Sequence, residues 1–472
     1  MQQETVQISK QIPVIADVDV LVAGGGIAGC TAAIAAARGG ARTMLVDRFG
    51  LLGGNMGPGM MSGGVVHQAL GYPYAMNGGL KGIPGEFLVR CEGYAGGQMG
   101  HQHLRDSAVG SYIWLRMMEE AKVRLLLNTY AADPLLEGDR VTGLTVENKS
   151  GSQAIRARVV VDATADADVA MRAGAPVGEG ESYVHPGMTF TMAGVDLEEF
   201  LAWLHGEHEI SDDDRAWAED IFTRYFGSPV RRLDPLIPLY RKAWEMGEYW
   251  IIKNIEDIAG VSMDHGIPHS PNEYFGPQDG LVSTQIGLRG KGIRSGDQAL
   301  MTRLEIGSRL YIFETAQFLR RYVPGFERSY LLVVSPYFGT RGGRGIVAQY
   351  ATTVEDMREG RRFDDVVFVH YGSDGATKME QGTDFPYRQL LPQKVEGLIC
   401  AGISSILQPP SLRPRWKCLL MGQAAGVAAA LAARDGVTPG AIDVKELQRT
   451  LVHRYDAPLG DRERLRELGL VD

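Results

Sequence analysis

The pattern of apolar residues begins with a short strand that runs directly into glycine. Residues 18–23 (VDVLVA) are almost continuously apolar and rich in valine, which is typical of a strand buried on both faces of a parallel sheet. Residues 30–38 (CTAAIAAAR) then continue as an alanine-rich helix, small enough to lie close to a sheet. A second apolar run at 41–46 (ARTMLV) predicts the next strand. This order predicts a βαβ unit near the N-terminus.

The residues between the first strand and the helix, 24–29 (GGGIAG), fit the pattern G-x-G-x-x-G. Glycine permits a tight turn and a close approach to a diphosphate, and the helix N-terminus directs N–H groups at that anion. Asp47 follows Gly29 by 47 − 29 = 18 residues, near the roughly 20 expected of an acid that binds an adenosine ribose. The sequence therefore predicts a dinucleotide site that includes Gly24, Gly26, Ile27, Ala28, Gly29 and Asp47.

In the middle of the chain the pattern of apolar residues becomes that of strands. Residues 123–127, 140–146 and 154–161 have the pattern of strands, and the turns at 137–139 and 149–152 are short. Short turns of this kind predict an antiparallel meander.

Two later regions complete the pattern. Helical patterns with aromatic residues appear around 200–204 and 301–318. Near the C-terminus, residues 395–402 (VEGLICAG) predict a strand that ends on glycine, and residues 417–432 predict a helix of small residues.

Composition narrows the class of partner. The 472 residues are 44% hydrophobic, and 48 basic against 57 acidic residues give a net charge of -9. This balance offers no electrostatic reason to expect nucleic acid or an anionic membrane, so we expect a small-molecule substrate. The four cysteines lie far apart without a C-x-x-C pair, which argues against a thiol redox couple, an iron–sulfur cluster or a zinc site. We expect no metal.

The chain begins without the basic start and apolar stretch of a signal peptide, and no segment offers about 18 uninterrupted apolar residues. We therefore expect a cytoplasmic protein.

The choice between FAD and NAD rests on two other segments. Residues 48–55 (RFGLLGGN) place a paired-glycine turn after Asp47, as in flavoproteins, where NAD dehydrogenases usually continue into a helix. The helix at 417–432 could set its positive N-terminal end against a flavin ring, although it could also be a tightly packed core helix. FAD is thus favoured, and the predicted cofactor contacts extend to Arg48, Gly53, Gly54, Asn55, Gly402 and Gly422.

Together these segments resemble the FAD-dependent oxidoreductases of the glutathione-reductase-like superfamily, in the branch near the heterodisulfide-reductase A and fumarate-reductase flavoproteins. The resemblance also rests on residues 159–168 (VVVDATADAD), 339–347 (GTRGGRGIV) and 385–392 (FPYRQLLP). It implies one non-covalent FAD and further cofactor contacts at Ala163 and Thr164.

The chain departs from the family pattern at three places. Ala165 stands where the family's Ala-Thr-Gly signature has glycine, Gly342 and Gly343 stand where many relatives have Glu-Ser, and Ile403 stands where an aspartate often follows the last strand. The cysteine motifs of iron–sulfur relatives are not in the sequence.

The expected fold class is α/β: a Rossmann-like FAD-binding domain with three-layer ββα architecture, interrupted by an α+β substrate domain. The predicted boundaries are 14–180 and 336–440 for the FAD-binding domain, 181–335 for the substrate domain, and 441–472 for a C-terminal helical tail.

Candidate catalytic residues are polar groups in glycine-rich loops. His101 and His103 lie on one face if their segment is extended, which suits catalysis, substrate binding, a metal or an ordinary polar surface. Arg341 and Arg344 could hold a carboxylate, a carbonyl or the charge of reduced flavin, or form a structural salt bridge. The segment 413–417 (RPRWK) is a third candidate cluster.

The predicted function is hydride transfer between flavin N5 and a small polar substrate such as an alcohol, a sugar or an acid. Reduction of an activated alkene or carbonyl, a nicotinamide-linked dehydrogenase, a non-catalytic flavin scaffold and a nucleic-acid-modifying flavoprotein are the alternatives, and the acidic charge counts against the last. The electron acceptor stays unknown, and a homo-oligomer is possible.

Overall fold

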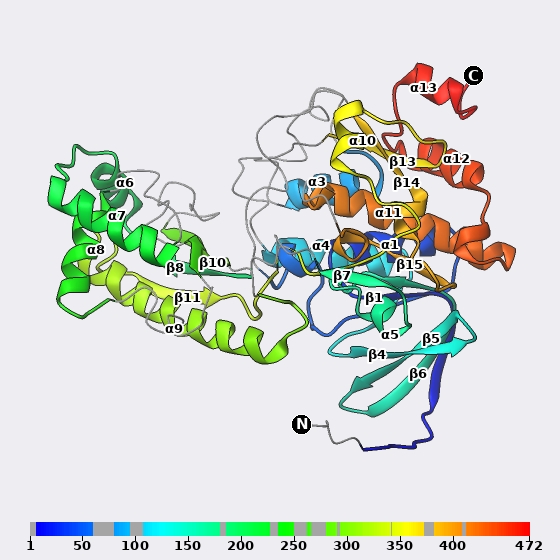
Figure 1. The fold of residues 1–472 in the computed structure, drawn as a ribbon, viewed down its shortest axis with the longest axis horizontal. Coiled ribbons are helices and arrows are strands. Elements are labelled where there is room, and N and C mark those ends of the chain that lie inside the picture. Colours follow the sequence, from blue (N-terminus) through cyan, green and yellow to red (C-terminus); the bar gives the residue numbers. More distant parts are fainter. Residues whose placement is uncertain are drawn as a thin grey trace.

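The computed structural model describes residues 6–59, 80–94, 107–179, 186–226, 235–249, 262–265, 280–289, 293–340, 342–371, 382–407 and 412–472. These residues form two lobes (Figure 1). We call the described residues before 180 and after 335 the terminal lobe, because both ends of the chain contribute to it, and residues 186–335 the middle lobe. The predicted domain boundaries stay predictions.

The terminal lobe is built on a sheet with strand order β3-β2-β1-β6-β5-β4, to which β15 is added beside β6. Strands β3, β2, β1, β6 and β15 are parallel neighbours, whereas β4, β5 and β6 are antiparallel. The strands are β1 (Val14–Ala23), β2 (Thr43–Val46), β3 (Arg124–Leu126), β4 (Tyr130–Glu137), β5 (Arg140–Asn148), β6 (Gly151–Asp162) and β15 (Leu398–Cys400).

The predicted meander exists, but its first strand was misplaced. The run at 123–127 contains β3, which joins the parallel strands beside β2. The strand that precedes the turn at Gly138 is β4, which was not predicted. Strand β4 is an edge strand whose residues are exposed or half-buried, and it contains Pro134, so it lacks the apolar alternation that marks a half-buried strand.

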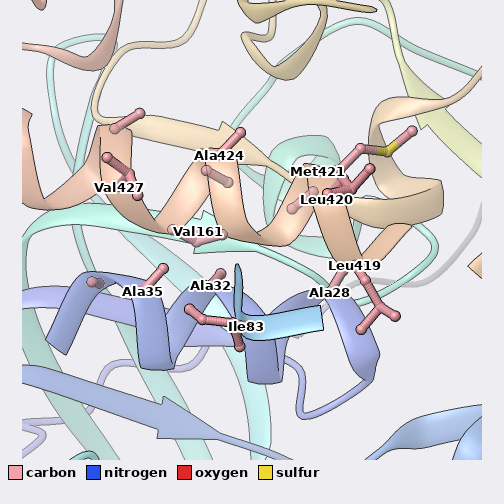
Figure 2. Packing of buried hydrophobic residues seen from close by; sticks show 14 of the residues in the cluster. Ala28, Ala32, Ala35, Ile83, Val161, Leu419, Leu420, Met421, Ala424 and Val427 are labelled. Carbon is pink, nitrogen blue, oxygen red and sulfur yellow. The ribbon is translucent and has the colours of Figure 1, made fainter. Parts of the chain in front are cut away.

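Helices and strands cover opposite faces of the parallel strands. Helices α1 (Ile27–Arg38) and α11 (Arg415–Asp435) lie on one face and share an apolar core with it (Figure 2). On the other face, apolar residues of β1 and β2 contact the meander, Val141 and Ile155 among them. The lobe therefore has helix, sheet and meander layers, which confirms the predicted α/β fold with a Rossmann-like ββα arrangement.

Helices α1 and α11 approach closely because both are made of small residues. A Cβ atom at Gly422 would lie 2.2 Å from the Ala28 carbonyl oxygen, and one at Gly426 would lie 2.1 Å from that of Ala32. Within the described ranges, α11 is the one helix long and apolar enough to span a bilayer, and its apolar window is completely buried inside the protein. The apolar residues of α11 therefore pack inside the protein, in part against α1.

The middle lobe is an α+β unit with its own apolar core. Its antiparallel sheet has the order β11-β8-β10-β9, and four helices accompany it within the described ranges (Figure 1). These elements are β8 (Gly187–Ala193), α6 (Leu197–Leu204), α7 (Asp212–Phe226), α8 (Leu236–Glu245), β9 (Ser262–His265), β10 (Leu281–Arg289), α9 (Gln298–Tyr322) and β11 (Tyr330–Val334).

The remaining elements belong to the terminal lobe. They are η1 (Gly54–Met56), α3 (Gly82–Tyr94), α4 (Ser107–Glu120), α5 (Asp168–Arg172), β7 (Val177–Glu179), β12 (Arg344–Ile346), α10 (Val354–Glu359), β13 (Val366–His370), β14 (Thr383–Pro386), η5 (Tyr387–Leu390), η6 (Gly402–Ser405), η8 (Pro439–Ala441), α12 (Val444–Tyr455) and α13 (Arg462–Glu467). Strand β12 pairs with β7 where the chain returns from the middle lobe.

Candidate functional site

The turn between β1 and α1 needs glycine at two of its positions for steric reasons. Gly24 has φ +104°, and a Cβ atom there would lie 2.4 Å from the Ala163 carbonyl oxygen. A Cβ atom at Gly29 would lie 1.8 Å from the Gly24 carbonyl oxygen. Gly26 differs, because a Cβ atom there would meet no described residue within 4 Å. The turn is therefore closed on its inner side and open in front of Gly26.

The N-terminus of α1, behind this open space, has the features of an anion-binding site. Gly26 is the N-cap of α1, no side chain caps the helix, and its first turn carries no acidic residue. The first backbone N–H groups of a helix have no partner within the helix, and they carry the positive end of its dipole. The space at Gly26, with Ile27 and Ala28 behind it, thus fits the diphosphate of a dinucleotide.

Asp47 lies directly beside this turn, at the carboxyl end of β2. Its carboxylate accepts hydrogen bonds from the backbone N–H groups of Gly25 and, at 2.7 Å, of Phe49. Burial raises the pKa of Asp47, and these two donors partly offset that effect. The structure therefore brings Gly24, Gly26 and Asp47 together, and their assignment to the diphosphate and the ribose stays a prediction.

We expect Asp47→Asn to raise the Kd for FAD about ten- to hundredfold, because hydrogen bonds to a charged group contribute about 1.5–3 kcal/mol. Quenching of FAD fluorescence on titration with the apoprotein measures this. Asp17→Asn is the matched control, since the Asp17 side chain is 67% exposed on β1. Equal affinities for the two variants would contradict an assignment of Asp47 to the cofactor.

The paired-glycine turn lies along the first glycine turn. Gly53 has φ +103°, and its N–H group donates to the Gly25 carbonyl oxygen at 2.8 Å. Asn55 follows at the start of η1, and its Oδ1 accepts a hydrogen bond from the Tyr337 hydroxyl at 3.0 Å. Gly53, Gly54 and Asn55 thus border the open space, and Asn55 connects it to the segment that returns from the middle lobe.

Arg48 belongs to an aromatic cluster at the same edge. Its guanidinium lies 4.7 Å from the centre of the Phe49 ring, and Phe49 stacks on Tyr337 with 4.5 Å between ring centres. Burial raises the pKa of Tyr337, so its hydroxyl stays protonated. Tyr337 was not among the predicted site residues, because its partners Phe49 and Asn55 lie far away in sequence.

The loop after β6, the strand next to β1, lies beside the glycine turn. The buried Asp162 carboxylate accepts hydrogen bonds from the backbone N–H groups of Thr164 and Ala170, at 3.0 Å each, and this fixes the loop. Ala165 has φ +77°, a conformation that favours glycine and explains why the family signature has glycine there. Ala163 and Thr164 lie next to Gly24, and their predicted contacts with the cofactor stay predictions.

Gly402 and Gly422 lie against the first turn of α1. A Cβ atom at Gly402 would lie 2.9 Å from the Ala28 Cβ atom, and Gly422 contacts the Ala28 carbonyl group, as described above. These contacts already account for glycine at both positions. Their predicted contacts with the cofactor stay predictions.

The predicted catalytic residues are not assembled by the described part of the structure. His101, His103 and Arg341 lie outside the described residues. Arg344 is 15% exposed, forms an ion pair with Asp168 at 2.5 Å, and also contacts the Met171 sulfur atom. This is the structural salt bridge that the sequence left open, so we assign Arg344 no catalytic role below.

A buried lysine and a buried histidine lie together at the first turn of α11. The Lys417 ammonium group donates to the Tyr371 carbonyl oxygen at 2.7 Å and lies 3.4 Å from His370 Nδ1. Burial lowers the pKa of Lys417 to about 7 and also lowers the pKa of His370. The sequence drew attention to Lys417 but not to His370, which ends an otherwise apolar strand.

Comparison with known proteins identifies the family. Residues 19–451 match the family described as FAD dependent oxidoreductase. No curated protein matches the sequence.

Several solved structures resemble the chain at low identity. A geranylgeranyl bacteriochlorophyll reductase-like protein from Thermoplasma acidophilum is 14% identical with a TM-score of 0.44, over 93% of this chain and 84% of that one. The Escherichia coli quinol fumarate reductase FrdA is 13% identical with a TM-score of 0.41, over 89% of this chain and 71% of that one. A myxobacterial chondrochloren halogenase is 13% identical with a TM-score of 0.37, over 96% and 81%.

Proposed function

Because the chain belongs to the FAD dependent oxidoreductase family, we propose that it transfers a hydride between a small polar substrate and the N5 atom of a non-covalently bound FAD. FAD and oxidoreduction follow from the family. The substrate class, an alcohol, a sugar or an acid, and the use of a hydride are our proposal. The observation that supports it best is the open space at Gly26, enclosed by the α1 N-terminus and Asp47.

Each part of the site has a distinct task in this proposal. The turn at 24–29 binds the diphosphate through backbone N–H groups, and Asp47 binds the adenosine ribose. The turn at Gly53 and the loop at Ala163 border the cofactor on its two sides. Bound FAD supplies the two-electron acceptor, so the protein must bind and orient the substrate beside it.

The direction of transfer is the second element of the proposal. We favour oxidation of the substrate, followed by transfer of the electrons to a separate acceptor. Reduction of an activated alkene or carbonyl is the alternative, and a flavin-binding scaffold without turnover is the non-catalytic one. We further propose a cytoplasmic location, with neither nucleic acid nor membrane as partner.

Anaerobic mixing of the FAD-loaded protein with glycerol, glucose, lactate, glycolate and succinate tests this proposal. We expect at least one of them to bleach the visible absorbance of oxidised flavin, and oxygen or an artificial acceptor to restore it. Bleaching by none of them, together with reoxidation of the dithionite-reduced protein by fumarate or an enone, would favour the reductase alternative. If neither bleaching nor reoxidation occurred, the result would favour the non-catalytic flavin-binding scaffold.

A further inference from the structure

Asp166 lies where three parts of the chain meet between the two lobes. It belongs to the loop between β6 and α5, next to the cofactor site of the terminal lobe. Ser295 approaches its carboxyl group from the segment that precedes α9 in the middle lobe. Gly343 approaches it from the segment that returns to the terminal lobe just before β12. The carboxyl group thus bridges the junction of the lobes.

The loop holds Asp166 in a defined position. Asp162 fixes both ends of the loop, as described above, and the Thr164 hydroxyl accepts a hydrogen bond from the Asp168 N–H group at 2.9 Å. The residues on either side, Ala165 and Ala167, have φ +77° and +50°. Alanine in a left-handed conformation is strained and persists only where surrounding contacts enforce it. The orientation of Asp166 is therefore imposed by the fold.

Because Gly343 has no side chain, the Asp166 carboxyl group can occupy the space beside its backbone. A Cβ atom at Gly343 would lie 1.8 Å from Asp166 Oδ1 and 2.6 Å from Ser295 Oγ. Asp166 Oδ1 is buried, and neither it nor Ser295 Oγ makes a hydrogen bond of good geometry within the described residues. Such an arrangement suits a protonated carboxyl group better than a charged one, because a buried charge with only the Ser295 hydroxyl beside it is costly.

The charged groups nearby compensate the charge of Asp166 only in part. Arg344 on β12 is paired with Asp168, and Arg48 after β2 lies over the Phe49 ring. Asp168 itself is a like charge on the adjoining helix and favours the neutral form of Asp166. Burial is the largest effect, and the pKa of Asp166 is raised to about 6 although Ser295, Arg344 and Arg48 act in the opposite direction.

We propose that Asp166, held between Ser295 and Gly343, is a proton-dependent latch that fastens the middle lobe to the cofactor-binding lobe. The protonated carboxyl group fits the closed junction. The ionised group favours an open junction, in which water can solvate it. This regulation goes beyond the proposed redox reaction and requires no substrate.

The direction of the pH effect on closure follows from the linkage between proton binding and closure. A carboxyl group whose pKa is raised in the closed state penalises closure above that pKa, and the penalty disappears as the pH falls toward the ordinary value near 4. Closure should therefore become about tenfold more favourable between about pH 7 and about pH 5. Most of the change should occur below pH 6.

Hydrogen exchange of the full-length, FAD-loaded protein tests the latch. Protection factors, corrected for the intrinsic pH dependence of exchange, are measured for peptides that cover residues 293–297 and 342–346. We expect them to rise about tenfold from about pH 7 to about pH 5. The same series without FAD keeps the test independent of the redox proposal, because it needs neither bound cofactor nor turnover.

Three variants separate the latch from general acid effects. Asp166→Asn cannot ionise, so its protection should stay constant over this pH range. Gly343→Ala displaces the carboxyl group and should also remove the dependence. Asp133→Asn, which makes the same charge change at an exposed position on β4, should behave as the wild type. Constant protection in the wild type, or an unchanged pH dependence in Asp166→Asn, would overturn the proposal.

Discussion

Replacing Gly26 with valine is expected to abolish FAD binding while the apoprotein keeps its fold. The backbone at Gly26 has φ -69° and ψ 178°, which any residue can adopt, and a Cβ atom there would meet no atom of the described residues within 4 Å. The open space lies in front of the α1 N-terminus, so a valine side chain would fill the volume assigned to the diphosphate. We expect the Kd for FAD to rise at least about a hundredfold, or about 2.7 kcal/mol.

The experiment compares FAD affinity with the thermal unfolding of the cofactor-free protein. Gly440→Val is the matched control, because Gly440 is exposed and a Cβ atom there would meet only Gln349 Nε2, at 4.0 Å, among the described residues. The control should bind FAD as the wild type does. If Gly26→Val also retained FAD, the diphosphate would have to lie elsewhere, and the assignment of the turn would be wrong.

The cofactor-binding part of the fold could be predicted because its signals are local. The turn at 24–29 and Asp47 lie within one βαβ unit. A backbone conformation or a close approach requires Gly24 and Gly29 there, and the missing side chain at Gly26 leaves the space assigned to the diphosphate. Strand β4 was missed for the opposite reason. Its exposed edge position imposes little apolar alternation, so pairing with β5 rather than its own sequence defines it.

The rest of the site depends on contacts between distant residues. Arg344 and its partner Asp168 are 176 positions apart, and Tyr337 and Asn55 are 282 apart. No spacing rule connects such pairs, so the arginine of a glycine-rich loop looked equally suited to a substrate and to a salt bridge. Asp166 was visible in the sequence as part of a signature, but the Gly343 backbone that covers it was not.

The contact between α1 and α11 leads to the second large effect, which concerns stability. We expect Gly422→Ala to lower the free energy of unfolding by about 3 kcal/mol. Its Cβ atom would lie 2.2 Å from the Ala28 carbonyl oxygen, which is helix backbone and cannot move aside as a flexible side chain can. Alanine favours a helix over glycine by about 1 kcal/mol, so only a steric conflict explains a net loss.

Urea unfolding of the apoprotein measures this loss, with Arg434→Ala on the same helix as the control. Arg434 is 52% exposed and pairs with Glu446 at the surface, so its removal should cost less than about 1 kcal/mol. A more stable Gly422→Ala protein would mean that the two helices lie farther apart than described. Because Ala28 belongs to the first turn of α1, moving it also moves the N–H groups assigned to the diphosphate. The variant should therefore bind FAD more weakly even where it is fully folded, so the spacing of the two helices sets both the stability of the lobe and the geometry of its cofactor site.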